Sequence, residues 1–237
     1  MAKPALLLLP GFLCDQTVWR EQVAAFEDDF ECSIASYEML DSLSAMAAHV
    51  VRTAPPAFAL AGHSMGGRVA LEVFRLAPER VTHIALFDTG CEALAPGEPA
   101  KAEIRARKRL LDIARARGMR AMSYEWIPPM IHPGRWQDEA LIEEMVRMME
   151  RSTPDRFEAQ MNALLARPST SELLPRISVP ALILTGREDG WSPPERHREI
   201  AGAIRGATLC IIPECGHMST MERPADVARA MTDWLAR

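Results

Sequence analysis

The sequence lacks a long hydrophobic run, and it lacks a large excess of charge of one sign. No apolar stretch is long enough to span a bilayer. The leucine run near the start is too short for a secretory leader and has no small-residue cleavage site after it. The net charge of −5 gives no general attraction to nucleic acid or to an anionic membrane. We therefore expect neither of these as a partner.

Cysteine is also sparse, and its spacing is irregular. The chain has five cysteines with neither paired spacing nor the spacing of metal ligands, so we expect no disulfide framework and no metal centre. An odd number of cysteines without a leader is typical of reduced thiols, which predicts a cytoplasmic location. These cysteines are Cys14, Cys32, Cys91, Cys210 and Cys215.

The composition and the hydrophobic pattern are those of an ordinary globular protein. Of the 237 residues, 48% are hydrophobic and 25% are charged, which suits one domain with an insertion. Strands alternate with helices, and this predicts an α/β fold with a parallel sheet and right-handed crossovers. Strands are expected near 4–10, 31–36, 57–61, 81–87, 179–185 and 207–212. Helices are expected near 17–26, 42–53, 65–77, 194–204 and 222–236.

The alternation stops once, over residues 91–175. Helical patterns follow one another there, near 100–117, 119–126, 136–151 and 154–166. We predict a core formed by 1–90 and 176–237, with 91–175 inserted as a helical lid that shapes a pocket and excludes water. Candidate pocket residues in the lid are Tyr124, Trp126 and Met130. Packing between the lid helices is an equally good explanation for the aromatic and methionine side chains of this segment.

A glycine-rich motif follows the third predicted strand. Gly62 and Gly66 stand two residues before and after Ser64, between an apolar run that ends at Ala61 and a helical pattern that begins at Arg68. On a tight strand-to-helix turn, glycines at these places remove Cβ atoms that would clash. The turn raises the serine at the sheet edge, where the helix N-terminus favours negative charge. Ser64 is therefore the candidate nucleophile.

A nucleophilic serine needs a base, and the base needs an acid that orients it. His217 follows the last predicted strand and a glycine, so its imidazole can fold back over a strand end. Asp189 follows the fifth predicted strand, and Asp88, which ends the fourth, is the alternative acid. His63 adjoins the serine but must point away from it on the turn. The predicted catalytic residues are Ser64, Asp189 and His217.

Four motifs resemble those of the α/β-hydrolase superfamily, and the resemblance extends along essentially the whole chain. The motifs are Leu9–Phe12, Gly62–Gly67, Gly186–Asp189 and Cys215–His217. Within this superfamily, the chain most resembles small bacterial carboxylesterases, including the type that cleaves pimeloyl-carrier-protein methyl ester. The resemblance implies an α/β-hydrolase fold with a trimmed, mainly six-stranded parallel sheet. It also implies an oxyanion hole formed by the backbone N–H groups of Phe12 and Met65.

These features together predict a cofactor-free serine hydrolase that cleaves small or medium acyl esters or thioesters through an acyl-enzyme. The expected partner is thus a small-molecule acyl ester. Lactone hydrolysis, carbon–carbon bond hydrolysis, perhydrolysis and lyase chemistry occur on the same scaffold and stay open. A hydrolase-shaped protein that binds a small molecule with little turnover is the alternative from another functional class.

The first predicted lid helix is strongly basic. Between Lys101 and Arg120 lie eight basic residues and two acidic ones, a net charge of +6 for the segment. Such a helix suits an acidic carrier protein or an anionic substrate. The helix predicted near 136–151 carries five acidic residues between Asp138 and Glu150, so the two helices would equally well neutralise each other.

Overall fold

The computed structural model describes residues 3–237 and contains one parallel sheet of six strands. The spatial order is β2-β1-β3-β4-β5-β6, and every neighbouring pair is parallel. This confirms the predicted α/β-hydrolase sheet. The strands are β1 (Ala5–Leu9), β2 (Glu31–Ile34), β3 (Phe58–His63), β4 (Val81–Phe87), β5 (Ala181–Gly186) and β6 (Thr208–Ile212).

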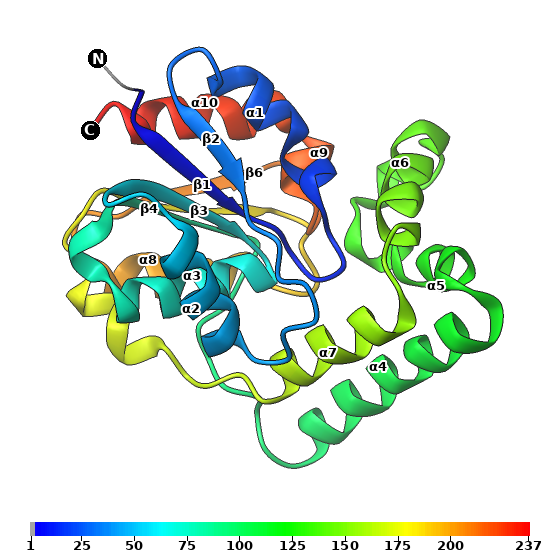
Figure 1. Cartoon of the computed structure of the whole chain (residues 1–237). Helices are drawn as coiled ribbons and strands as arrows, with labels where there is room; N and C mark the ends of the chain where they lie inside the picture. Colours follow the sequence, from blue (N-terminus) through cyan, green and yellow to red (C-terminus); the bar gives the residue numbers. More distant parts are fainter. Residues whose placement is uncertain (1–2) are drawn as a thin grey trace.

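Helices cover both faces of the sheet. Helices α1 (Arg20–Phe26) and α10 (Pro224–Leu235) lie on one face (Figure 1). The other face is covered by α2 (Leu43–Thr53), α3 (Met65–Leu76) and α8 (Pro194–Ala203). With both faces covered, the central strands carry almost continuous apolar sequence, and every residue of β3 is buried.

The last predicted helix is divided in the structure. A short helix α9 (Ser219–Glu222) precedes α10, and Arg223 between them has an extended φ of −135°. Pro224 begins α10 because proline lacks an N–H and fits the first helical position. The prediction of one helix over 222–236 is therefore wrong at its start.

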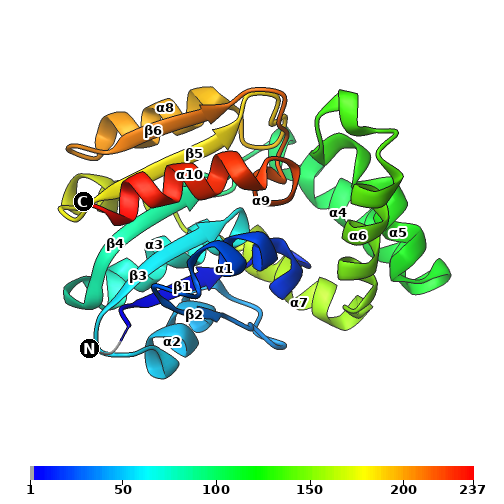
Figure 2. The ribbon, with the colours of Figure 1, turned by 90° about the horizontal axis from the view of Figure 1, so that it is seen from above.

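Four helices lie between β4 and β5, beyond the carboxyl ends of the strands (Figure 2). They are α4 (Glu98–Arg117), α5 (Met119–Trp126), α6 (Glu139–Glu150) and α7 (Pro154–Leu165). Helix α6 begins three residues later than predicted, because Pro133–Arg135 form a 3₁₀ turn and the Asp138 side chain caps α6 by accepting from Leu141 N–H. Further 3₁₀ turns are Gln16–Trp19, Pro78–Arg80, Pro128–Met130 and Ser171–Arg176.

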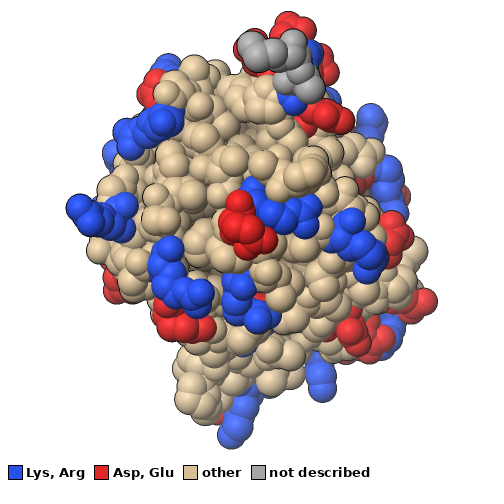
Figure 3. All heavy atoms as spheres, turned by 60° about the vertical axis from the view of Figure 1, so that its left-hand side comes forward, with Lys and Arg blue, Asp and Glu red and all other residues tan. Residues whose placement is uncertain are grey.

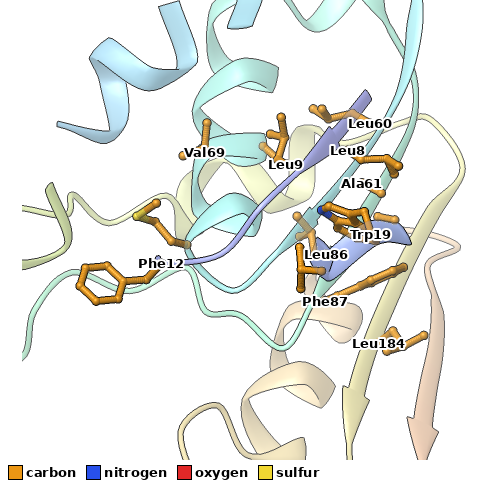
Figure 4. Close-up of a cluster of buried hydrophobic side chains, with 14 of the residues drawn as sticks. Leu8, Leu9, Phe12, Trp19, Leu60, Ala61, Val69, Leu86, Phe87 and Leu184 are labelled. Atoms are coloured by element: carbon orange, nitrogen blue, oxygen red, sulfur yellow. The ribbon is translucent and has the colours of Figure 1, made fainter. Parts of the chain in front are cut away.

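The hydrophobic core runs from the sheet into this helical insertion. Trp19 is fully buried beside Phe87, with ring centroids 5.7 Å apart. Phe12 points away from that strand cluster (Figure 4). Its ring instead contacts Trp126 and Phe157 of the insertion, at centroid distances of 4.7 and 5.1 Å. The loop after β1 thus joins the core to the insertion.

Charged side chains of both signs are mixed over the surface. On the face drawn in Figure 3, Lys and Arg side chains are interspersed with Asp and Glu. In the part of the chain that the structure describes, none of the helices is both long enough and apolar enough to cross a membrane.

Candidate active site

Ser64 sits on a strained turn between β3 and α3. Its φ of 54° and ψ of −115° lie outside the regions that non-glycine residues usually adopt. A Cβ atom on Gly62 would lie 2.3 Å from the Gly66 carbonyl oxygen, and one on Gly66 would lie 2.1 Å from the Leu9 carbonyl oxygen. Both glycines are therefore required by close backbone contacts. The turn holds the serine at the carboxyl end of the sheet.

The structure brings three of the predicted site residues into one hydrogen-bonded chain. Ser64 Oγ lies 2.8 Å from His217 Nε2. His217 Nδ1 donates to Asp189 Oδ2 across 2.8 Å. Asp189 Oδ1 in turn accepts from the N–H groups of Trp191 and Ser192, each at 2.8 Å. The carboxylate is thereby fixed, and it fixes the imidazole with Nε2 toward the serine.

The electrostatics of this chain favour a basic imidazole. Burial alone would lower the pKa of His217, but the charge of Asp189 and the hydrogen bond to it raise that pKa above its ordinary value. Burial would raise the pKa of Asp189, yet the His217 contacts and two backbone N–H groups lower it. Asp189 therefore stays ionised at neutral pH while His217 exchanges a proton.

Asp88, the alternative acid, occupies a different position. It is fully buried and accepts hydrogen bonds from Gly186 N–H and from the backbone and hydroxyl of Ser219. Burial, and then the nearby Asp189 charge, raise its pKa. It makes no hydrogen bond to His217 among residues 3–237, so it ties the β5 end to the segment after the histidine instead.

His63 points away from the serine, as the turn requires. Its Nε2 donates to the His217 carbonyl oxygen at 2.8 Å. Burial lowers the pKa of His63 to about 3, so the ring is neutral. The hydrogen bond from His63 thus helps to fix the backbone of His217.

Glu222 is a site residue that the sequence analysis missed. The side chain is 2% exposed, and its Oε1 accepts from the N–H groups of Gly216 and Met218 at 3.0 and 3.2 Å. Its Oε2 accepts from His132 N–H at 2.8 Å. Glu222 thus clamps both neighbours of His217 and joins them to the insertion. Glu222 begins the helix predicted near 222–236, and a glutamate at the start of an amphipathic helix is expected to face solvent. The sequence therefore gives no sign that this side chain is buried and binds the His217 loop.

The two predicted oxyanion donors are free to bind a ligand. Within residues 3–237, neither Phe12 N–H nor Met65 N–H donates a hydrogen bond to the protein. Both residues line a cavity of ≈ 430 Å³ together with Ser64 and His217. Met65 is also the first residue of α3, where backbone N–H groups have no partner within the helix.

The insertion supplies one wall of this cavity. Trp126 and Met130 line it, and Trp126 stacks on Trp191 with centroids 5.7 Å apart. The Met130 carbonyl accepts from His217 N–H at 2.6 Å. Tyr124 does not reach the cavity: it is 47% exposed, and its hydroxyl pairs with Glu143 on the outer side of α5 and α6. The prediction of Tyr124 as a pocket residue is wrong, because its position on α5 faces outward.

Metal-binding side chains are not gathered anywhere in the described chain. Residues 3–237 contain no group of three or more His, Cys, Asp or Glu side chains arranged to hold a metal ion.

Comparison with known proteins identifies the family of this chain. A model of the alpha/beta hydrolase family matches residues 6–230, so the chain belongs to that family. A putative carbamate hydrolase RutD from Variovorax paradoxus is 27% identical over 98% of this chain and 92% of its own length. A 2-hydroxy-6-oxononadienedioate/2-hydroxy-6-oxononatrienedioate hydrolase from Pseudomonas sp. is 24% identical over 86% of this chain and 68% of its own.

Solved structures give the same result. A thermophilic esterase from Thermogutta terrifontis has a TM-score of 0.84 and 28% identity, covering 99% of this chain and 91% of that one. The enol-lactonase from Burkholderia xenovorans has a TM-score of 0.85 at 20% identity, covering 100% and 93%, which reports the shared fold. Fold, family and relatives together define this protein as a hydrolase of the α/β-hydrolase type.

Proposed function

We propose that the protein is a serine hydrolase that cleaves small or medium acyl esters or thioesters through an acyl-enzyme. The observation that carries this proposal is the unbroken chain from Ser64 Oγ through His217 to Asp189, with both links at 2.8 Å. In this mechanism His217 takes the hydroxyl proton as Ser64 attacks the carbonyl carbon. Asp189 holds the imidazole in the required tautomer and stabilises its cation.

The developing oxyanion is held by the N–H groups of Phe12 and Met65, which have no partner among the described residues. Collapse of the tetrahedral intermediate breaks the ester bond. His217 then gives its proton to the leaving alcohol or thiol. Water repeats the sequence on the acyl-enzyme and releases the acid.

We further propose that residues 91–175 act as a lid over this site. Trp126 and Met130 from the insertion line the cavity, and Met130 binds the backbone of His217. A movement of the insertion would therefore alter both the pocket wall and the support of the base.

The proposal is tested with a fluorophosphonate probe and a panel of esters, thioesters and lactones of varied acyl length. Stoichiometric labelling of Ser64 together with turnover of a 4-nitrophenyl ester supports the enzyme. Labelling without measurable turnover on any substrate would instead support a binding protein. A strong preference for lactones or for carbon–carbon bonds would replace the ester with one of those substrates.

Glu222→Gln tests the support of the base. The Glu222 carboxylate accepts from three backbone N–H groups, but a glutamine amide has one acceptor oxygen, and its NH₂ group would face at least one of these N–H groups. We therefore expect the unfolding free energy to fall by about 1–3 kcal/mol. The displaced histidine should lower kcat roughly tenfold or more with KM little changed. Glu214→Gln is the control, since Glu214 lies in the same loop but its side chain is 75% exposed. Equal kcat values in the two variants would contradict the role of Glu222.

The basic helix α4 is largely balanced by acidic side chains within the insertion. Arg105 pairs with Glu98 at 2.7 Å and Arg115 pairs with Glu158 at 2.6 Å. Arg109 pairs with Glu125 of α5. Beyond the end of α4, Arg120 of α5 pairs with Glu143 and Glu150 of α6. Among the described residues, these arginines of α4 are thus paired with Glu98, Glu125 and Glu158 and not with the acidic helix α6, which pairs with Arg120 of α5. This local pairing favours neutralisation within the insertion over docking of an acidic carrier protein.

Charge reversal distinguishes these two roles. The variant replaces Arg105, Lys108, Arg109 and Arg115 with glutamate. We expect a lower melting temperature and an unchanged ratio of activity on a carrier-bound ester to activity on a short free ester. A loss confined to the carrier-bound ester, fading above ~0.15 M salt where the Debye length is about 8 Å, would support carrier docking instead.

A further inference from the structure

The cavity that holds Ser64 has a second, strongly basic end. Its lining includes four arginines that come from separate parts of the chain. Arg68 lies on α3, Arg107 lies on α4, Arg167 follows α7, and Arg196 lies on α8. The basic end is therefore formed where the core meets the insertion.

The acidic side chains around these arginines do not balance them. Glu103 is shared, since it accepts from Arg107 at 2.9 Å and from Arg167 at 2.8 Å. Arg68 donates through Nη1 to the Glu92 carbonyl oxygen at 2.8 Å, and no carboxylate of residues 3–237 lies within ion-pair distance of it. Arg107 and Arg167 thus share the Glu103 carboxylate, while the Arg68 guanidinium hydrogen-bonds to a carbonyl oxygen.

Arg196 adds no excess charge, because it pairs with the Glu92 side chain at 3.5 Å. Asp88 also lines the cavity, but its carboxylate is already bound to Gly186 N–H and to Ser219. The excess positive charge therefore belongs to Arg68, Arg107 and Arg167.

Parts of this arginine cluster have no partner in the described chain. Arg107 Nη1 and Arg167 Nε are buried and donate no hydrogen bond within residues 3–237. Burial, and then the neighbouring Arg167 charge, lower the pKa of Arg68 to about 10, which still leaves it charged at neutral pH. Like charges gathered in one pocket are unfavourable unless an anion binds there.

The basic end adjoins the reacting groups. Arg68 is one helical turn after Ser64, and its N–H donates to the Ser64 carbonyl oxygen at 3.4 Å. The guanidinium carbon of Arg107 lies 5.4 Å from the centroid of the Phe12 ring. The nucleophile and the arginines therefore line the same cavity.

We propose that this end of the cavity binds a carboxylate of the substrate, so that the substrate is an ester or thioester carrying a second, ionised acid group. Guanidinium groups suit this task because their forked donors match a carboxylate. The ester part of this statement rests on the proposed function. The anion site rests only on the arginines.

The test uses matched substrates that differ only in charge. The 4-nitrophenyl monoester of adipic acid is compared with the ester in which the free acid is replaced by a primary amide. We expect kcat/KM to be about tenfold or more higher for the acid. A second pair, 4-carboxyphenyl and 4-carbamoylphenyl butanoate, places the charge on the alcohol side. Preference in one pair assigns the side that carries the acid, and equal rates in both pairs overturn the anion site.

Arginine variants test whether the cavity arginines cause the preference for the acid substrate over the amide. Arg68→Gln and Arg107→Gln should each lower the ratio of acid to amide activity about tenfold. Arg109→Gln is the control, because Arg109 lies on the same helix as Arg107 but is 69% exposed and pairs with Glu125. A ratio that falls equally in the control would show a general surface charge effect and would contradict the site.

Calorimetry on the Ser64→Ala protein separates this proposal from the proposed function. Monomethyl adipate should bind about tenfold tighter than methyl adipamate, and Arg107→Gln should remove the difference. Such binding supports the anion site whether or not the protein hydrolyses esters. Hydrolysis of neutral esters through Ser64 without any preference for the acid would leave the proposed function intact and refute the anion site.

Discussion

Replacing Ser64 with alanine is expected to lower ester turnover by several orders of magnitude. The hydroxyl supplies the attacking oxygen, and no other group in the hydrogen-bonded chain can replace it. The close turn is made possible by Gly62 and Gly66, where an added Cβ atom would clash with the backbone. Alanine therefore fits the site, and the melting temperature should change little. The measurement is kcat/KM on a 4-nitrophenyl ester.

Ser123→Ala is the matched control for this loss. Ser123 is a buried serine on α5 that does not line the cavity, and within residues 3–237 its hydroxyl donates only to the Met119 carbonyl. Its removal should leave the turnover within a few-fold of wild type. If Ser64→Ala also retained activity in that range, the catalytic assignment would be wrong.

Asp189→Asn should produce the second largest loss, roughly a thousandfold or more in kcat. Asparagine keeps the shape but presents an amide donor or a neutral acceptor to His217 Nδ1. It no longer enforces the tautomer, and it no longer stabilises the imidazolium. Asp88→Asn should cost far less catalytic activity, because Asp88 contacts Gly186 and Ser219. The reverse ranking would make Asp88 the orienting acid.

The pH dependence of kcat/KM is a second measurement that distinguishes Asp189→Asn from Asp88→Asn. Activity should rise with pH as His217 loses its proton, and Asp189 raises the pKa of that imidazole. Removing the Asp189 charge should therefore move the acidic limb of kcat/KM to lower pH. An unmoved limb in Asp189→Asn would show that this carboxylate does not act on the base.

The six-stranded sheet and the candidate triad follow from local sequence signals. Strands such as β3 are buried on both faces, so they appear as unbroken apolar runs next to turn residues. Glycine is required on both sides of Ser64 because a Cβ atom at Gly62 or Gly66 would lie within 2.3 or 2.1 Å of a backbone oxygen. Asp189 and His217 each follow a strand, and parallel strands end at one edge of the sheet.

The rest of the site depends on contacts between segments far apart in the sequence. Glu222 and Asp88 act through backbone N–H groups of other loops, and such acceptors leave no periodic pattern. Tyr124 and Trp126 lie two residues apart on α5, so a helical turn directs one outward and the other into the cavity. Both residues are aromatic, so residue type alone does not tell which of them lines the cavity. Of the cavity arginines, only Arg107 belongs to the basic segment, and the others come from distant elements, so no sequence pattern groups them.

The acyl-enzyme on Ser64 is the central claim, and mass spectrometry of protein quenched during turnover tests it most directly. With a slowly hydrolysed ester or a fluorophosphonate, the peptide that contains Ser64 should gain the mass of one acyl or phosphonyl group. The gain should be stoichiometric and absent from the Ser64→Ala protein. Turnover with the added mass on another residue, or with no covalent intermediate under conditions that trap one, would contradict the account.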